Sequence, residues 1–145
     1  MLASAPTITR YSRYYSFVVS YYDSAGFDLS SFDGNDILVT SGNGFTGAAS
    51  LTSVVRGWRS TIRVATYTVH GPGRAWDASD NAGYSINLQP NQVRDTGGRF
   101  AAAGVLGTFT VNIPAPAIVP AIVPTTMVFQ TRRKILEGPV WDRSA

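Results

Sequence analysis

The chain contains no cysteine, one histidine, one lysine and few charged residues, which make up 14% of its 145 positions. Without cysteine it has no disulfide, no thiol nucleophile and no cysteine-based zinc site. A single histidine excludes a multi-histidine metal site and leaves little room for a Ser-His-Asp triad. Glycine and proline are plentiful, at 14 and 8 residues. This composition favours one loop-rich β domain of ordinary size, and it predicts neither an enzyme nor a bound cofactor.

Basic charge is sparse and lies mostly towards the C-terminus. The formal net charge is +3. Residues 1–113 carry eight Arg and seven Asp, hence +1, while residues 114–145 carry four basic and two acidic residues, hence +2. A nucleic-acid-binding domain typically carries a dense basic stripe, whereas Arg56, Arg59 and Arg63 are spaced as on a solvated face. We therefore predict no nucleic-acid partner.

Membrane and export signals are not visible in the sequence. No stretch approaches the ~20 consecutive apolar residues of a membrane-spanning helix. Residues 1–6 (MLASAP) lack both the basic and the apolar region of a signal peptide. We predict no membrane partner, and the chain either acts without signal-peptide export or is a piece of a longer protein.

Alternating apolar and polar residues predict about seven short strands. The clearest is residues 14–22 (YYSFVVSYY), in which every second residue from Tyr15 to Tyr21 shares one face. Further strands are predicted near residues 7–10 and at 36–40, 48–55, 61–70, 84–88 and 106–113. Residues 1–113 contain no convincing amphipathic helix. Short strands separated by frequent turn signals are typical of a β-sandwich.

Residues 80–86 (DNAGYSI) match a local motif of immunoglobulin domains, D-x-A-x-Y-x-C, with isoleucine in place of cysteine. In those domains the tyrosine forms the tyrosine corner, in which its hydroxyl bonds to upstream backbone. We predict this role for Tyr84, with Ile86 packing between the sheets; the alternative is a plain turn before a strand. The predicted fold is an all-β, immunoglobulin-like sandwich over residues 13–113, with residues 1–12 as an N-terminal arm or edge strand.

Several longer stretches carry a family resemblance: VSYYD (19–23), FDLSSFDGNDILVT (27–40), NGF (43–45), ATYTV (65–69), PGRAWD (72–77), DNAGY (80–84), NQVRDTGG (91–98) and GVLGTFTVNI (104–113). In combination they resemble the immunoglobulin-like (cadherin-like) repeats of very large bacterial, especially cyanobacterial, surface and secreted proteins. The resemblance implies a spacer or adhesive role and no catalysis. The chain departs from these repeats in holding one copy, in carrying Arg99 where the repeats have a neutral side chain able to bind a ligand, and in its extension over residues 114–145.

Aspartates in the predicted loops offer a calcium site as an alternative: Asp23, Asp28, Asp33 and Asp36 in one loop region, and Asp77, Asp80 and Asp95 in others. Calcium takes six to eight oxygen ligands. No run has the spacing of an EF-hand loop, and aspartate is common in turns because its side chain bonds to nearby backbone. Arg94 and Arg99 beside Asp95 favour local charge neutralisation. We predict no metal.

Two catalytic arrangements are conceivable and are not favoured. His70 and Asp77 with a serine would imitate a triad, but residues 70–73 (HGPG) are typical of a strand entering a tight turn, and no G-x-S-x-G motif occurs. Asp77 and Asp80 would imitate a glycosidase pair, but Asp80 belongs to the predicted corner. Tyr14 and Tyr22 lie on the strand face opposite Phe17, so they are candidates for contact with a partner or a sugar.

Residues 114–124 (PAPAIVPAIVP) repeat the unit AIVP. Proline at this density predicts an extended, polyproline-like linker of about 34 Å. Its aliphatic residues favour an arm that lies in a hydrophobic groove of a partner. Residues 125–145 form a C-terminal arm in which TTMVFQ (125–130) has the character of an added strand. The alternative is that the arm folds back on its own domain. The predicted partner-binding residues are Ile118, Val119, Ile122, Val123, Met127, Phe129, Arg132, Arg133, Ile135, Leu136 and Trp141.

The sequence as a whole predicts a non-enzymatic structural protein that binds to the proteins of a capsid or surface layer and forms a homo-oligomer. The favoured form is a phage capsid decoration (cement) subunit or another virion surface component, tethered by its C-terminal arm. The alternative is a cell-surface or secreted adhesion module that binds carbohydrate through Trp76 and the loops of residues 23–36, with or without calcium.

Overall fold

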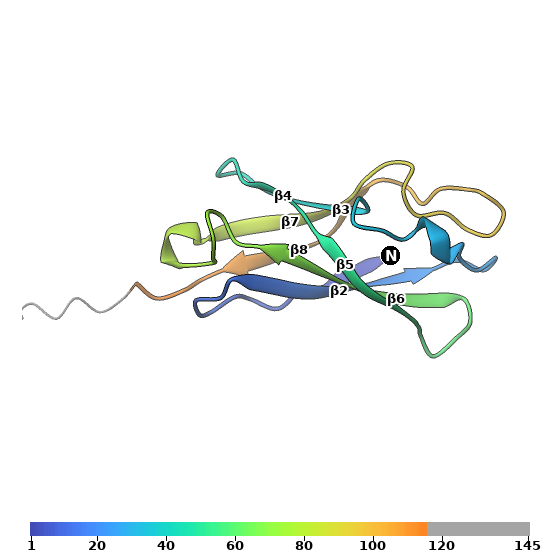
Figure 1. The fold of residues 1–145 in the computed structure, drawn as a ribbon, viewed down its shortest axis with the longest axis horizontal. Coiled ribbons are helices and arrows are strands. Elements are labelled where there is room, and N and C mark those ends of the chain that lie inside the picture. The colour runs from blue at the N-terminus through green and yellow to red at the C-terminus, as the bar shows by residue number, and fades with distance from the viewer. Residues whose placement is uncertain (116–145) are drawn as a thin grey trace, which may run out of the picture. The chain divides into compact units, whose positions relative to one another are not determined.

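The structure, a computed structural model, describes residues 1–115. These residues form β-strands and two short 3-10 helices (Figure 1). The elements are β1 (Leu2–Ser4), β2 (Tyr14–Tyr22), η1 (Leu29–Ser31), β3 (Ile37–Ser41), β4 (Thr46–Ala48), β5 (Ser50–Arg56), β6 (Ile62–His70), η2 (Ala78–Asp80), β7 (Ala82–Leu88) and β8 (Gly104–Val111). Over residues 1–115 no helix is long and apolar enough to cross a bilayer.

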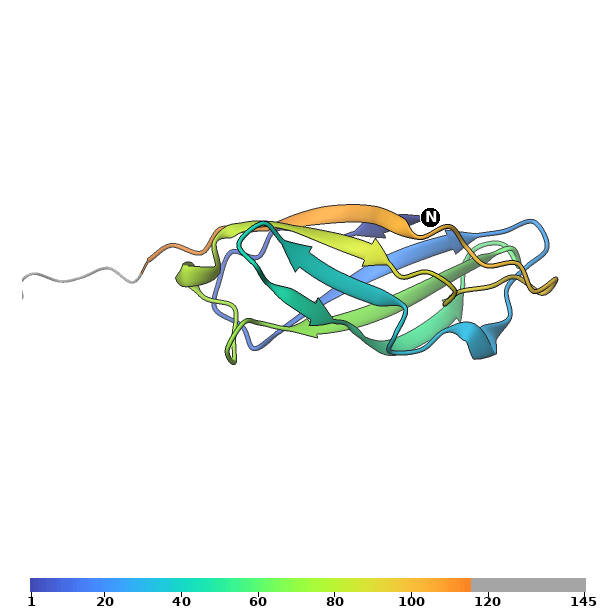
Figure 2. The same ribbon diagram turned by 90° about the horizontal axis from the view of Figure 1, so that it is seen from above.

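The strands make two four-stranded antiparallel sheets that lie one over the other (Figure 2). The strand orders are β1-β2-β6-β5 and β4-β3-β7-β8. The first is the A-B-E-D order of an immunoglobulin constant-type sandwich, and β3, β7 and β8 take the places of C, F and G. Strand β4 adds one edge strand. The predicted all-β, immunoglobulin-like sandwich is confirmed.

The core lies between the two sheets and follows the period of two in the sequence. In β2, Phe17, Val19 and Tyr21 are buried while Tyr14 and Tyr22 are exposed. Strand β6 buries Ala65, Tyr67 and Val69 in the same way, and β7 buries Tyr84, Ile86 and Leu88. Ile86 is 0% exposed, so an aliphatic side chain fills the position that carries the disulfide cysteine in antibody domains.

The strand predicted over residues 48–55 is found as β5 from Ser50 onwards, but Ala48 belongs to β4, because the chain changes sheets between them. Residues 46–48 pair with β3, whereas residues 50–56 pair with β6 in the other sheet. The change occurs at Ala49, which is fully buried and donates its N–H to the Ile37 carbonyl at 3.1 Å. A further irregularity follows between Leu51 and Ser53, where the register of β5 shifts. The consecutive polar residues Thr52 and Ser53 interrupt the alternation at this second point, whereas the sequence gives no sign of the change of sheet at Ala49.

The N-terminal strand lies earlier than residues 7–10, where it was predicted. Leu2–Ser4 pairs with β2, and the chain then crosses to the second sheet, where Ile8 bridges Val111 in parallel. The Ile8 N–H donates to Thr110 O at 2.9 Å, and Asn112 N–H donates to Ile8 O at 2.8 Å. The N-terminal residues therefore contact both sheets along the side formed by β1 and β8.

The predicted tyrosine corner is confirmed. The Tyr84 hydroxyl donates to the main-chain carbonyl of Asp80 at 2.6 Å and accepts from the Asn43 side chain at 3.2 Å. Helix η2 holds the carbonyl in place through a capping box, in which Ser79 N–H donates to the Asp77 carboxylate and Asp77 N–H donates to the Asp80 carboxylate. The turn between β6 and β7 is therefore fixed to the start of β7.

Replacing Tyr84 with phenylalanine is expected to lower the free energy of unfolding by about 2 kcal/mol, because it leaves the Asp80 carbonyl and the Asn43 amide without this partner. Urea denaturation monitored by fluorescence would measure the change. Tyr22→Phe is the matched control, since Tyr22 is 57% exposed, and its expected change is below about 0.5 kcal/mol. Equal effects of the two substitutions would contradict a stabilising corner.

Candidate functional site

The residues predicted to bind a partner all lie outside the described residues, so the structure neither groups nor separates them. They are Ile118, Val119, Ile122, Val123, Met127, Phe129, Arg132, Arg133, Ile135, Leu136 and Trp141. The same holds for the predicted linker over residues 114–124 beyond Ala115, and for the arm over residues 125–145.

The aspartates of residues 1–115 are used to shape loops. Each of the seven accepts a hydrogen bond from a main-chain N–H of its own loop: Asp23, Asp28, Asp33, Asp36, Asp77, Asp80 and Asp95. This is the turn chemistry that favours aspartate in loops. Within the part of the chain that the structure describes, no three histidine or acidic side chains are placed to hold a metal ion. The arrangement thus favours turn formation as the role of these carboxylates.

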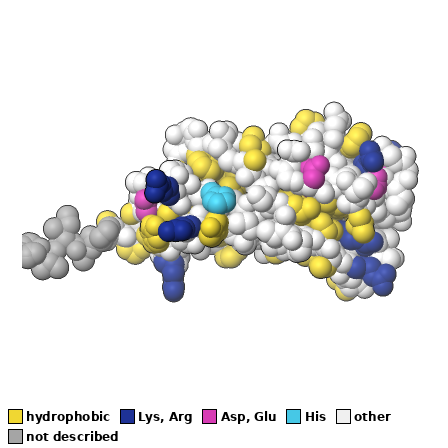
Figure 3. Space-filling view, viewed as in Figure 1, with side chains coloured by type: hydrophobic (Ala, Val, Ile, Leu, Met, Phe, Trp, Pro, Cys, Tyr) yellow, Lys and Arg dark blue, Asp and Glu magenta, His cyan; other side chains and the backbone are white. Residues whose placement is uncertain are grey.

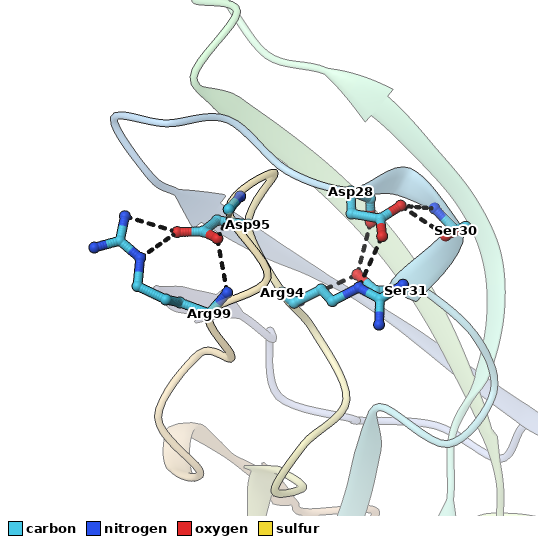
Figure 4. A network of polar contacts seen from close by, with 7 residues as sticks. Asp28, Ser30, Ser31, Arg94, Asp95 and Arg99 are labelled. Atoms are coloured by element: carbon cyan, nitrogen blue, oxygen red, sulfur yellow. Dashed lines mark hydrogen bonds and ion pairs between the residues drawn. The ribbon is translucent and has the colours of Figure 1, made fainter.

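Two ion pairs neutralise carboxylates at one end of the domain: one joins the loop after β2 to the loop after β7, and the other lies within the loop after β7 (Figure 4). Arg94 Nε donates to Asp28 at 2.7 Å, and Arg99 Nη2 lies 2.9 Å from Asp95 Oδ2. The hydroxyl and N–H of Ser30 and the Arg94 guanidinium lower the pKa of Asp28. The main-chain N–H of Arg99 lowers the pKa of Asp95, and its guanidinium adds to this. Asp95 thus lies at the same end as Asp28, although 67 positions separate them.

The prediction that Trp76 contributes to carbohydrate binding is wrong. Its side chain is 0% exposed and packs among Phe45, Tyr84 and Phe109, at ring-centroid distances of 5.6, 5.1 and 5.8 Å. The exposed tryptophan of the described residues is Trp58, at 78%, with the Arg59 guanidinium 4.2 Å from its ring centre. A carbohydrate site that uses Trp76 as a stacking platform is therefore excluded.

His70 and Asp77, the pair that would imitate a triad, each have another role. His70 is the last residue of β6, and its ring meets that of Tyr14 edge-on at 4.8 Å. Asp77 is the N-cap of η2 and accepts from Ser79. These contacts agree with the interpretation of residues 70–73 as a strand end that enters a turn.

A polar cleft lies where β2 begins and β6 ends. Its volume is about 470 Å³, and its walls are formed by Tyr11, Arg13, Tyr14, His70, Gly73 and Arg74. We call it the Arg13–Arg74 cleft. Figure 3 shows the histidine in cyan with arginine side chains beside it and apolar side chains between them. The sequence pointed to Tyr14 as a contact residue but not to the cleft, because its walls come from segments about 60 positions apart in the chain.

Main-chain hydrogen bonds hold the two walls of the cleft together. Gly71 N–H donates to Arg13 O at 3.2 Å, and Ser12 and Trp76 exchange N–H···O bonds of 3.2 and 2.6 Å. Tyr14 is paired with His70 in the β2–β6 register. The turn over residues 71–76 is therefore fixed against the start of β2.

Replacing Gly71 with alanine is expected to lower the free energy of unfolding by about 3 kcal/mol, because an added Cβ would overlap main-chain atoms of Ala75 and Trp76. Thermal unfolding followed by circular dichroism would measure the loss. Gly83→Ala is the matched control, since a Cβ at Gly83 meets no atom of residues 1–115 within 4 Å, and its expected change is below about 1 kcal/mol. A Gly71→Ala protein as stable as the control would show that the main chain of the turn can shift to accommodate the added Cβ without loss of stability.

Comparisons with known proteins assign no function to this geometry. No protein-family model and no curated protein matches the chain. Among solved structures, the chain is similar to "Structure of surface layer protein SbsC, domains 1-6", at 16% identity and a TM-score of 0.41. The similarity covers 81% of this chain and 14% of that one, so this chain spans a small part of that protein's length.

Proposed function

We propose that this chain is a non-enzymatic structural subunit, which presents its sandwich domain and docks onto a larger assembly through residues 114–145. The observation that carries the proposal is the position at which the folded unit ends. That unit comprises Met1–Pro114, and the run of proline-spaced isoleucine and valine residues follows directly. The apolar residues of the extension thus come directly after the last residue of the sandwich unit.

The end of the domain is fixed by Asn81. The Asn81 side chain accepts from the Ile113 N–H at 2.8 Å and donates to the Ile113 carbonyl at 2.9 Å. Ile113 itself is 7% exposed. Both main-chain groups of the residue before Pro114 are therefore satisfied within the domain, which gives the extension a fixed point of departure.

The composition of residues 116–145 supports docking rather than a plain spacer. A solvated linker is rich in glycine, serine or charge, whereas this segment carries Ile118, Val119, Ile122 and Val123 between prolines. Burying an aliphatic side chain is worth about 1.5–3 kcal/mol, so four of them would supply substantial contact energy. Met127, Phe129 and Trp141 continue the apolar character, and aromatic residues are common anchors of interfaces.

In its specific form, the proposal makes the protein a phage capsid decoration (cement) subunit or another virion surface component, self-associated and located on the virion. The second candidate is a cell-surface or secreted adhesion module, as the resemblance to bacterial surface repeats implies. The sandwich order and the tyrosine corner support both candidates equally, since both use an immunoglobulin-like domain as a displayed module.

Density-gradient fractionation of the producing culture, probed with an antibody against residues 1–114, would test the proposal. We expect the protein to sediment with DNA-containing particles, and tagged protein ending at Pro114 to stay in the soluble fraction although it is folded. Sedimentation with cell envelopes would favour the adhesion module. Full-length protein found only in the soluble, monomeric fraction, or truncated protein that assembles normally, would overturn the tether.

A further inference from the structure

The Arg13–Arg74 cleft has a positive charge that the domain does not neutralise. Arg13 and Arg74 are exposed, and over residues 1–115 neither lies within ion-pair distance of a carboxylate. The ion pairs of the described residues are formed by Arg94 and Arg99, which both lie in the loop between β7 and β8. Because an arginine stays protonated at all physiological pH values, the cleft presents two guanidinium groups to solvent.

The aromatic walls of the cleft are exposed as well. Tyr11 is 64% and Tyr14 53% exposed, while the contact with His70 holds the Tyr14 ring from one side. An exposed tyrosine offers an apolar ring face for C–H groups and a hydroxyl that both donates and accepts. The cleft therefore combines surfaces for an apolar ring, for hydroxyl groups and for a negative charge.

Size and rigidity make this combination usable as a binding site. A volume of about 470 Å³ lies within the usual range of small-ligand sites. The main-chain bonds from Gly71 to Arg13 and between Ser12 and Trp76 fix both walls, so little backbone ordering is needed on binding.

We propose that the Arg13–Arg74 cleft binds a carboxylate-bearing sugar, such as a uronic acid unit of a polysaccharide. The two guanidinium groups bind the carboxylate through charge-assisted, forked hydrogen bonds. Tyr11 and Tyr14 contact the sugar ring, and their hydroxyls and the His70 ring nitrogens bond its hydroxyl groups. A phosphate ion or an acidic peptide would use the arginines and leave the aromatic walls without a partner, which is why the sugar is favoured.

Titration of the ¹⁵N-labelled full chain with a hyaluronan tetrasaccharide, followed by NMR, would test the site. We expect shifts of the main-chain amides of Tyr14, His70 and Arg74 that saturate with the sugar. The neutral tetrasaccharide tetra-N-acetylchitotetraose is expected to bind at least about tenfold more weakly, because it lacks the carboxylate. Inorganic phosphate and an acetylated triglutamate peptide serve as anions without a sugar ring.

Substitutions test the arginines and the tyrosines of the cleft separately. Arg13→Gln combined with Arg74→Gln is expected to weaken tetrasaccharide binding by at least about tenfold, and Tyr11→Ala severalfold. The matched control is Arg56→Gln combined with Arg59→Gln, which removes the same charge from exposed arginines of the β5–β6 region. Its expected effect on binding is less than twofold, and unchanged spectra elsewhere would show that each variant is folded.

Three outcomes would overturn the proposal. Tetrasaccharide binding that is unaffected by the Arg13 and Arg74 substitutions would place the site elsewhere. Phosphate or triglutamate binding as tight as the tetrasaccharide would mean that the cleft takes anions in general, or acidic peptides, rather than sugars. Absence of saturable shifts with every probe would exclude a binding role for the cleft. None of these results bears on the tether, which rests on residues 114–145.

Discussion

Replacing Trp76 with alanine is expected to lower the free energy of unfolding by about 4 kcal/mol. The side chain is fully buried and contacts three aromatic rings, from the β3–β4 turn (Phe45), β7 (Tyr84) and β8 (Phe109). Those rings are held by strand pairing and by the tyrosine corner, so they cannot collapse to fill the cavity. Since typical domains are stable by about 5–15 kcal/mol, the loss would be a large part of the total. Urea denaturation would measure it.

Two further variants show whether the loss comes from the buried ring. Trp58→Ala removes the same atoms from a side chain that is 78% exposed, and its expected cost is below about 1 kcal/mol. Trp76→Phe is expected to keep much of the stability, because it retains an aromatic ring and because the Trp76 Nε1 has no hydrogen-bond partner among residues 1–115. Equal costs for Trp58→Ala and Trp76→Ala would contradict a core role for Trp76.

Features that depend on local repetition could be predicted from the sequence. Alternation marked β2, β6 and β7 because one face of each strand meets the core and the other meets solvent. The corner at Tyr84 was predictable from a short motif instead, since its hydroxyl bonds to a carbonyl only four positions upstream, within the matched residues 80–86. The buried residues of a strand recur at every second position, and the two groups of the corner lie four positions apart, so a short stretch of sequence contains both signals.

Features that depend on register or on sheet exchange could not be predicted in this way. The chain leaves one sheet for the other at Ala49, and the alternation on either side does not record which sheet a residue joins. The Arg13–Arg74 cleft requires Tyr14 to be paired with His70, which no local pattern specifies. Trp76 follows a turn-rich run that is typical of exposed loops, yet its main chain is paired with Ser12 and its ring enters the core.

The second large effect is expected at Asp36, a carboxyl group that is 0% exposed. Its Oδ2 accepts from the Tyr67 hydroxyl at 2.8 Å and from the Asp33 N–H at 3.0 Å, while Oδ1 has no hydrogen-bond partner within residues 1–115. The Tyr21 hydroxyl lies 2.8 Å from that of Tyr67 and extends the chain of hydrogen bonds. Burial raises the pKa of Asp36 from 3.8 to about 6, although the bonds from Tyr67 and Asp33 oppose the rise.

This raised pKa makes the domain more stable in mild acid. The native state binds the Asp36 proton at pH values where the unfolded chain has released it, so the contribution is fully present below about pH 4 and is lost as the pH rises through about 6. The free energy of unfolding is expected to be about 1 kcal/mol greater at pH 5 than at pH 7.5. Burial also raises the pKa of Asp80, which adds in the same direction. Asp28 and Asp95, whose pKa values are lowered, reduce stability only at more acidic pH.

Tyr67→Phe is therefore expected to cost about 3 kcal/mol at pH 7.5 and about 1 kcal/mol at pH 5. At the higher pH the substitution removes the hydroxyl that stabilises a buried carboxylate, whereas at the lower pH the carboxyl group is mostly neutral and loses an ordinary hydrogen bond. Asp36→Asn keeps an oxygen acceptor without the charge, so in that background Tyr67→Phe should cost about 1 kcal/mol at both pH values. Urea denaturation of the four proteins at both pH values measures this coupling. A cost of Tyr67→Phe that does not change with pH, in either background, would mean that the hydroxyl acts through packing rather than through the charge of Asp36.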